Sequence, residues 1–379
     1  MRKSISLAAA SLAALLATSA GAEINIGVTV SATGPAASLG IPEKNTFALM
    51  PTTMGGQKVN YIVLDDATNP TEANKNARRL VTENKVDAIV GSTTTPTSLA
   101  ALEVAAETGT PIIMMAPIPP QTGEKQAWGF VTPQGIGLMA SALIGQMKAD
   151  GVKSLGFIGY ADAYGEVWLN AMKPQVEKAG IKMDVIERYQ RNDTSVTGQV
   201  LKLISAKPDA VLVVGSGTPA VLPQATLNER GYKGKIYQTH GVANRDFLRV
   251  GGKNVEGAVF PVGPMLLAEE LADSHPSKKP ALEYVSVYEK EYGKDSRSTF
   301  GAHAWDSGLL LANAVPQALK KGQPGTPEFR KALRDALEAT KELPASHGVF
   351  NMSPTDHNGF DERARVMVKV EGGTWKLIK

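Results

Sequence analysis

The 379-residue chain contains no cysteine. This absence excludes disulfide bonds, iron–sulfur clusters, thiolate metal sites and cysteine nucleophiles. The chain lacks a strong excess of either charge, because 40 Lys and Arg against 37 Asp and Glu give a formal net charge of only +3. A nucleic-acid partner is therefore disfavoured. A hydrophobic content of 43% is typical of a folded globular protein, and the length predicts two domains.

Residues 1–22 have the pattern of a secretory signal peptide. A basic start at Arg2 and Lys3 precedes an apolar run from Ile5 to Ala17 and a small-residue end at Ala22. The run is shorter than the roughly 20 apolar residues that a membrane-spanning helix needs. We therefore expect cleavage after Ala22 and a mature protein that is free outside the cytoplasm.

Short β-rich runs alternate with helix-length segments along the rest of the chain, which is typical of βαβ units and parallel sheets. One series of predicted strands covers 24–30, 59–64, 88–90 and 112–115; a second covers 154–159, 183–189, 210–214, 236–239 and 258–262. A further strand is expected at 364–370. Two such series predict an α/β protein with two lobes.

Motifs for catalysis are missing. The sequence has no G-x-S-x-G, no phosphate-binding loop and no H-E-x-x-H, and its five histidines are too scattered to predict a metal site. One weak dinucleotide-like match, at 135–140 with Asp162 downstream, lies at a lobe boundary rather than in a first βα turn. Asp65 and Asp66 end a strand, where capping is a stronger expectation than catalysis. We expect no cofactor, no metal and no enzyme.

Three loops at the carboxyl ends of predicted strands are rich in small and hydroxyl side chains: 31–35, 92–96 and 215–219. Open α/β sheets bind ligands at this edge, and each loop precedes a predicted helix. Backbone N–H groups at a helix N-terminus favour a small anion such as a carboxylate. N-capping by Ser and Thr explains any single loop equally well. The occurrence of three such loops favours a ligand site.

In the order and spacing of these segments the chain resembles a periplasmic solute-binding protein of the branched-chain amino-acid type, the receptor of an ABC importer. The resemblance covers the whole mature chain and is carried by the segments 27–35, 90–94, 111–116, 162–165, 208–211 and 241–244. It implies a periplasmic location and two Rossmann-like lobes of the type I fold, joined by three crossovers and closing on the solute by a hinge. We place the first lobe at 23–133 plus 263–343 and the second at 134–262 plus 344–379.

The resemblance also assigns residues to the site. Anchors for a ligand carboxylate are expected on the first lobe, and an aromatic side chain, Tyr164, is expected to close over the solute from the second lobe, where two further residues face the cleft. The expected ligand-binding set is Ser31, Ala32, Ser92, Thr93, Thr94, Met115, Ala116, Tyr164, Thr218 and His240.

Two departures from the amino-acid-binding pattern concern the ligand's ammonium. Amino-acid-binding members hold it with an acid before the Gly-Val-Ala-Asn segment and another after the crossover strand, but here the first position is His240 and the second region, 132–137, has no acid. Burying an unpaired ammonium costs several kcal/mol. The Gln-Thr-His-Gly-Val-Ala stretch at 238–243 resembles the branch that takes up aromatic acids. Met115 and Tyr164 are then expected beside a ring; for Phe260 core packing is the stronger expectation.

These features predict a monomeric periplasmic receptor that captures a small carboxylate, an aromatic or aryl-oxo acid, and delivers it to the membrane permease of an ABC importer. A receptor for a branched-chain or other aliphatic amino acid is the first alternative. An exported α/β enzyme is the second, and a sensing module for a signalling partner is the third.

Overall fold

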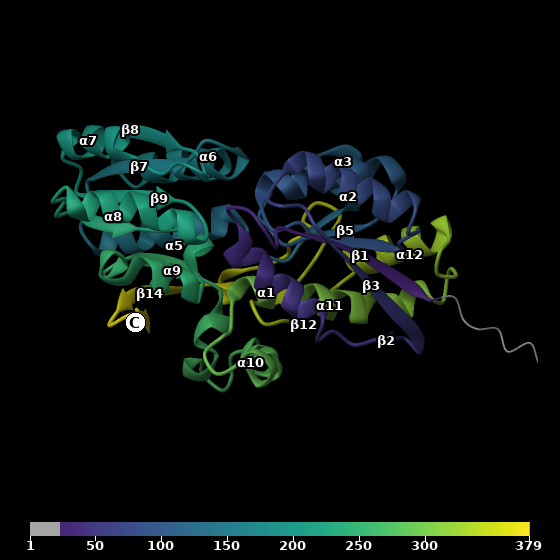
Figure 1. The fold of residues 1–379 in the computed structure, drawn as a ribbon. Helices are drawn as coiled ribbons and strands as arrows, with labels where there is room; N and C mark the ends of the chain where they lie inside the picture. Colours follow the sequence, from purple (N-terminus) through teal and green to yellow (C-terminus); the bar gives the residue numbers. More distant parts are fainter. Residues whose placement is uncertain (1–22, 379) are drawn as a thin grey trace, which may run out of the picture.

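The computed structural model describes residues 23–378, so the predicted signal peptide and its cleavage site lie outside the described residues. Within them, two separate sheets form two lobes that lie side by side (Figure 1). This arrangement confirms the α/β class with two lobes that the sequence predicts.

The sheet of the first lobe has the order β2-β3-β1-β4-β5-β6 and is parallel except for β2. Its strands are β1 (Ile24–Val30), β2 (Thr53–Met54), β3 (Gln57–Asp65), β4 (Ala88–Val90), β5 (Ile112–Met114) and β6 (Gly129–Val131). The helices between them are α1 (Ala37–Phe47), α2 (Pro70–Thr82), α3 (Thr95–Thr108) and α4 (Gly123–Trp128). The predicted strands 24–30 and 88–90 have the observed bounds.

The sheet of the second lobe has the order β15-β14-β11-β10-β9-β7-β8, in which β14 and β15 are antiparallel additions. Its strands are β7 (Ser154–Tyr160), β8 (Lys182–Tyr189), β9 (Ala210–Val214), β10 (Lys235–Tyr237), β11 (Val259–Val262), β14 (Val366–Glu371) and β15 (Thr374–Leu377). The helices of this lobe are α5 (Ile136–Ala149), α6 (Ala163–Lys178), α7 (Thr197–Ala206), α8 (Val221–Glu229) and α9 (Arg245–Gly251).

After β11 the chain returns to the first lobe. There it forms α10 (Lys278–Tyr292), α11 (Thr299–Ala318), α12 (Pro327–Glu338) and the short pair β12 (Leu343–Pro344) and β13 (Val349–Phe350). Figure 1 shows α11 and α12 beside β1 and β3, and the final segment back in the second lobe at β14.

Alternation along the strands places a hydrophobic layer on each face of the first sheet. Val90 faces a core shared with α1, α11 and α12, whereas its neighbour Ile89 faces the core formed by α2 and α3. Local sequence signals set the helix starts: Asn69 caps α2 by accepting the N–H of Thr71 at 2.8 Å, and Thr326 caps α12 by accepting that of Phe329. None of the helices in 23–378 has the length and apolarity to cross a membrane.

Candidate functional site

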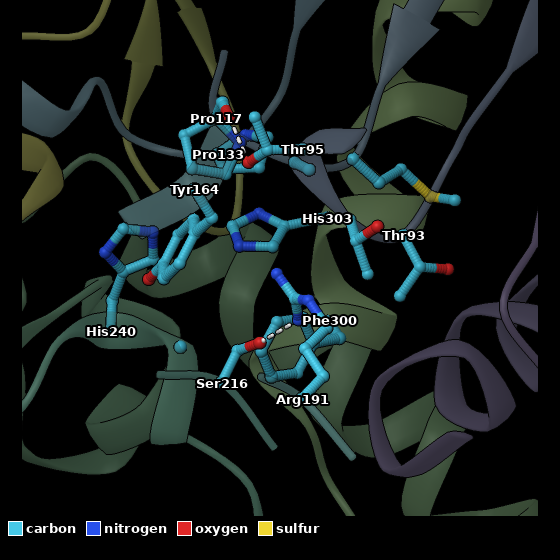
Figure 2. A pocket seen from close by; sticks show the side chains of 14 residues that line it. Thr93, Thr95, Pro117, Pro133, Tyr164, Arg191, Ser216, His240, Phe300 and His303 are labelled. Atoms are coloured by element: carbon cyan, nitrogen blue, oxygen red, sulfur yellow. Dashed lines mark hydrogen bonds between the residues drawn. The ribbon is translucent and has the colours of Figure 1, made fainter. Parts of the chain in front are cut away.

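A small cavity of about 20 Å³ lies where the carboxyl ends of both sheets meet. Both lobes contribute to its wall, and the side chains converge from opposite sides in Figure 2. Its lining consists of Thr93, Thr94, Thr95, Met115, Ala116, Pro117, Phe300 and His303 from the first lobe, Pro133 from the crossover, and Tyr164, Arg191, Ser216, His240 and Gly241 from the second. Such a volume holds a water molecule but no organic acid, so a ligand enters only when the lobes separate or side chains turn.

The turn between β4 and α3 supplies three threonines to this wall. Thr94 is the N-cap of α3 and forms a capping box with Thr97, so its hydroxyl is engaged at the helix start. Thr95 donates its hydroxyl to the carbonyl oxygen of Pro117 at 2.7 Å. Thr93 accepts the N–H of Ser31 at 2.8 Å and is hydrogen-bonded to the carboxyl group of Glu43.

Behind this turn lies Asp66, which is fully buried. Its carboxyl group accepts the hydroxyl protons of Ser31 at 2.7 Å and Thr29 at 3.1 Å, the N–H of Thr68 at 3.0 Å, and the hydroxyl of Ser92. Burial is the largest influence on its pKa and raises it, and these hydrogen bonds oppose that rise. Asp66 therefore ties the turn after β1 to the turn after β4. This supporting role agrees with the expectation from the sequence that Asp66 has a structural and not a catalytic function.

On the second lobe, Arg191 brings a positive charge to the cavity. Its Nε donates to Asp162 Oδ2 at 2.6 Å, its Nη1 donates to Ser216 Oγ at 3.0 Å, and its guanidinium carbon lies 4.1 Å above the ring of Tyr160. Within the described residues no hydrogen bond engages Nη2. A guanidinium held at two nitrogens keeps its remaining donors in a fixed direction, which suits a carboxylate.

Two histidines face the cavity without a partner for one ring nitrogen. His240 and His303 are both buried, and Nδ1 of each lacks a hydrogen-bond partner in the part of the chain that the structure describes. Burial, with the nearby His347 as a smaller cause, lowers the pKa of His240 to about 3; the same two causes, and His240 itself, lower that of His303 well below its usual value. Both rings are neutral at pH 7. Neutral imidazoles can donate to an anion or to an oxo group without adding charge.

The ring of Tyr164 forms part of the second-lobe wall. Its hydroxyl is hydrogen-bonded to the hydroxyl of Thr239 at 2.8 Å, which fixes the ring beside the cavity. Gly241 must be glycine here, because a Cβ would lie 2.5 Å from the carbonyl oxygen of Gly215 and 2.9 Å from the Tyr164 hydroxyl. The chain thus brings the loops after β9 and β10 close together at the cavity.

The structure brings six of the ten predicted residues into this wall: Thr93, Thr94, Met115, Ala116, Tyr164 and His240. The other four lie nearby without lining it. Ser31 and Ser92 bind Asp66, Ala32 packs against the first-lobe core, and Thr218 begins a 3-10 turn, Thr218–Ala220. Phe260 packs in the second-lobe core, as the stronger expectation had it.

Sequence reasoning missed Arg191, Ser216, Phe300 and His303. Ser216 lies in the loop 215–219, whose small and hydroxyl side chains already marked it as a candidate ligand loop. Phe300 and His303 come from α11, where the sequence shows no ligand-binding motif, and Arg191 follows β8 in a polar stretch that also lacks one. Convergence of segments so far apart in sequence is visible only in the fold.

A larger cavity of about 610 Å³ lies beside the crossovers, with Ile118, Val167 and Ala171 among its lining residues. Its histidine, His357, is already hydrogen-bonded to the Gly129 carbonyl oxygen and to Glu338. The dinucleotide-like segment 135–140 opens α5 at this place, at a crossover between sheets and not in a first βα turn. Over residues 23–378 no three His, Asp or Glu side chains gather as a metal ion would require.

Comparison with known proteins supports the likeness found in the sequence. The model of the periplasmic binding protein family matches residues 23–374. The chain belongs to this family. Its members are binding proteins and not enzymes, and the chain is accordingly a periplasmic solute-binding receptor of the ABC importer type.

Three relatives illustrate the range of this family. An extracellular ligand-binding receptor from Rhodopseudomonas palustris HaA2 is 47% identical, with a TM-score of 0.93, and the match covers 94% of this chain and 100% of that one. A Leu/Ile/Val-binding protein homolog 3 from Brucella melitensis is 27% identical over 89% of each chain. A solute-binding protein of an R. palustris ABC transporter, solved in complex with benzoate, is 17% identical with a TM-score of 0.76 over 94% of this receptor and 96% of that protein, a likeness of fold alone.

Proposed function

We propose that this receptor captures a small acid without an amino group, an aromatic or aryl-oxo acid, by closure of its two lobes. The observation that carries the proposal is the charge of the cavity wall. Its lining residues include the cation Arg191 and two neutral histidines but no carboxylate. On the second lobe, the acid Asp162 already accepts a hydrogen bond from Arg191, a lining residue. A buried ammonium would lack an anionic partner here, whereas a carboxylate would find a cationic partner in Arg191.

The apolar part of the wall supports an aromatic group. Phe300, Met115 and Tyr164 offer ring and thioether surface, and Pro117 and Pro133 add flat apolar contacts. The fold is also one on which a benzoate complex is known. Arg191 and Thr93 would hold the carboxylate, and His240 and His303 would donate to an oxo or hydroxyl group.

A branched-chain or other aliphatic amino acid is the second candidate. The name of the Brucella relative, a Leu/Ile/Val-binding homolog, favours it. Its ammonium would need a partner from outside the observed wall, such as Asp162 released from Arg191. This alternative therefore predicts that the charge pair rearranges on binding.

A thermal-shift screen of residues 23–379 tests the two candidates with matched pairs. Phenylpyruvate is compared with phenylalanine, and 4-methyl-2-oxopentanoate with leucine, because each pair differs only in oxo against amino group; benzoate is added as a plain aromatic acid. A ligand at 100 times its Kd adds about 2.7 kcal/mol of stability. Stabilisation by phenylpyruvate or benzoate supports the proposal. Stabilisation by 4-methyl-2-oxopentanoate alone would keep the acid without an amino group but overturn its aromatic part. Stabilisation by leucine and phenylalanine alone would overturn it in favour of the amino-acid receptor.

Delivery to a membrane permease, action as a monomer and removal of residues 1–22 complete the proposal. For the lobe division we propose one revision. The first-lobe core includes Ala345, Phe350 and Met352. This packing favours a third crossover between Met352 and β14, whereas the sequence-based division begins the last second-lobe segment at residue 344. Analytical ultracentrifugation and N-terminal sequencing of the exported protein test the monomer and the cleavage site.

A further inference from the structure

Glu43 is a buried carboxyl group one contact away from the cavity. It lies on α1, its side chain is fully buried, and one of its oxygens, Oε2, is hydrogen-bonded to the hydroxyl of Thr93. Its other oxygen, Oε1, has no hydrogen-bond partner among residues 23–378. Thr93 itself lines the cavity, so Glu43 acts on the ligand site through Thr93.

The hydrogen bond between Thr93 and Glu43 can run in either direction. A threonine hydroxyl has one proton and two lone pairs. The N–H of Ser31 donates to one lone pair, with 2.8 Å between the nitrogen and Oγ1. If Glu43 were ionised, Thr93 would have to donate its only proton to Glu43, and a lone pair would face the cavity. If Glu43 carries a proton, it donates to the second lone pair, and the Thr93 proton is free to point at a ligand.

We propose that Glu43 is held protonated and thereby makes Thr93 a hydrogen-bond donor towards an acid in the cavity. Glu43 is then a positioning residue, since it touches Thr93 and not the ligand. The inference rests on the proposed function, because only an acid ligand needs a donor at this position. Thr94 and Thr95 cannot replace Thr93, because their hydroxyls are engaged by Thr97 and by the Pro117 carbonyl oxygen.

The surroundings of Glu43 favour the neutral form. An ionised carboxylate would leave a buried oxygen without a donor, which is costly, whereas the carbonyl oxygen of a neutral acid tolerates this far better. Burial raises the pKa of Glu43 well above its usual value, and the nearby carboxyl of Asp66 raises it further; a hydrogen bond donated by Thr93 to the ionised form acts against this rise.

Among the described elements packed against α1, no cation pairs with Glu43. The strand β1, which packs against α1, has no ionisable side chain, and on α11 the ionisable residues His303 and Asp306 both interact with His347. The tyrosines of α10 reach α1 at Asn45, and Lys44, next to Glu43 in sequence, is exposed.

Infrared spectroscopy tests the protonation directly. We expect wild-type protein at pH 7 to show the carbonyl band of a buried protonated carboxylic acid that is lost in Glu43→Gln. An exposed glutamate on α2's C-cap, changed in Glu83→Gln, is the matched control and should leave the band intact. If wild type and Glu43→Gln have the same spectrum in this region, Glu43 is ionised and the inference is wrong. Should Glu43→Gln not fold, Thr93→Val must shift the band, and an unshifted band would overturn the hydrogen-bond assignment.

Calorimetry with phenylpyruvate and benzoate tests the consequence for binding. The amide of Glu43→Gln can still donate to Thr93, so its Kd should stay within about threefold of wild type, whereas Thr93→Val should raise it at least tenfold. A folded Glu43→Gln that binds tenfold more weakly would contradict the inference. If neither acid binds wild type and the amino acids do, the proposed function fails on its own, and the infrared band still reports the state of Glu43.

Discussion

Arg191 and Asp162 form a charge pair across the edge of the second sheet, with 2.6 Å between Nε and Oδ2. Asp162 also caps α6 by accepting the N–H of Tyr164 at 2.9 Å. One carboxylate therefore fixes both the cation and the start of the helix that carries the cavity's tyrosine. The free edge of the guanidinium is thus held in a fixed direction, which would lower the entropy cost of binding the proposed acid.

Arg191→Gln should weaken the binding of an acid by about 10- to 100-fold, because a hydrogen bond to a charged group contributes about 1.5–3 kcal/mol. The variant also leaves Asp162 without its cation beside the site, which adds to the loss. Calorimetry with phenylpyruvate or benzoate measures the change in Kd.

Arg188→Gln is the matched control for this prediction. Arg188 lies three residues earlier and also pairs with a carboxylate, that of Glu166. The side chains of Arg188 and Glu166 are each 44% exposed, whereas that of Arg191 is 13% exposed. Exposed pairs contribute little. Equal Kd values for the two variants would remove Arg191 from the site.

His240→Glu should weaken the binding of an acid by about 1–3 kcal/mol, since it places a carboxylate beside the ligand and removes a donor. His240→Gln keeps a neutral donor and should lose less. Calorimetry on both variants separates charge from shape. Unchanged affinity in His240→Glu would show that the ring does not face the ligand, and tighter binding of leucine by this variant would indicate that a new ammonium partner has formed.

The buried histidines make stability depend on pH. A histidine in the unfolded chain has a pKa near 6.5, and burial lowers that of His240 to about 3. Between these values the unfolded state binds the extra proton, so the free energy of unfolding falls as pH falls from about 6.5 towards 3. Urea unfolding at pH 7, 6 and 5 should give a shallower decline in His240→Gln than in wild type, by up to about 1.4 kcal/mol per pH unit. Parallel declines would contradict the burial of a neutral His240.

Local patterns predicted most of the fold. Ile24–Val30 and Ala210–Val214 are apolar runs covered on both faces, and the caps at Asn69 and Thr326 mark helix starts with a side-chain acceptor. The short strands β2 and β15 were missed because each is an antiparallel edge strand that depends on one neighbour for its pairing.

The residues predicted in the cavity wall had either a loop signal or a family motif. Thr93 and Thr94 lie in the small-residue loop 92–96, whereas Met115, Ala116, Tyr164 and His240 came from the resemblance to the family. Arg191 and His303 have no local signal, because Arg191 is placed by a distant carboxylate and His303 by the packing of α11 near the crossovers, where its ring stacks on His347 at a centroid distance of 4.0 Å. Long-range placement of this kind follows from tertiary contacts that a single sequence does not display.

Tyr164→Ala should mainly speed ligand dissociation, because the ring covers the cavity from the second lobe and its loss opens the closed state. Tyr164→Phe keeps the ring and loses only the hydrogen bond to Thr239. Its off-rate should stay close to that of wild type. Stopped-flow dissociation of a bound acid measures both. If the alanine variant releases ligand at the wild-type rate, Tyr164 does not take part in closure.

Glu43→Gln should alter the pH dependence of stability in the sense opposite to His240→Gln. The pKa of Glu43 is raised by burial, so the folded state holds a proton that the unfolded state releases above its own pKa of about 4.3. The free energy of unfolding of wild type therefore includes a contribution that is present at low pH and is lost as pH rises towards the folded pKa. Glutamine has no such contribution. The stability of the variant relative to wild type should grow from pH 5 to pH 8 in urea unfolding, whereas Glu83→Gln should show no growth. If the difference in stability between Glu43→Gln and wild type stays constant with pH, Glu43 has the same pKa in the folded and the unfolded chain, and the prediction is wrong.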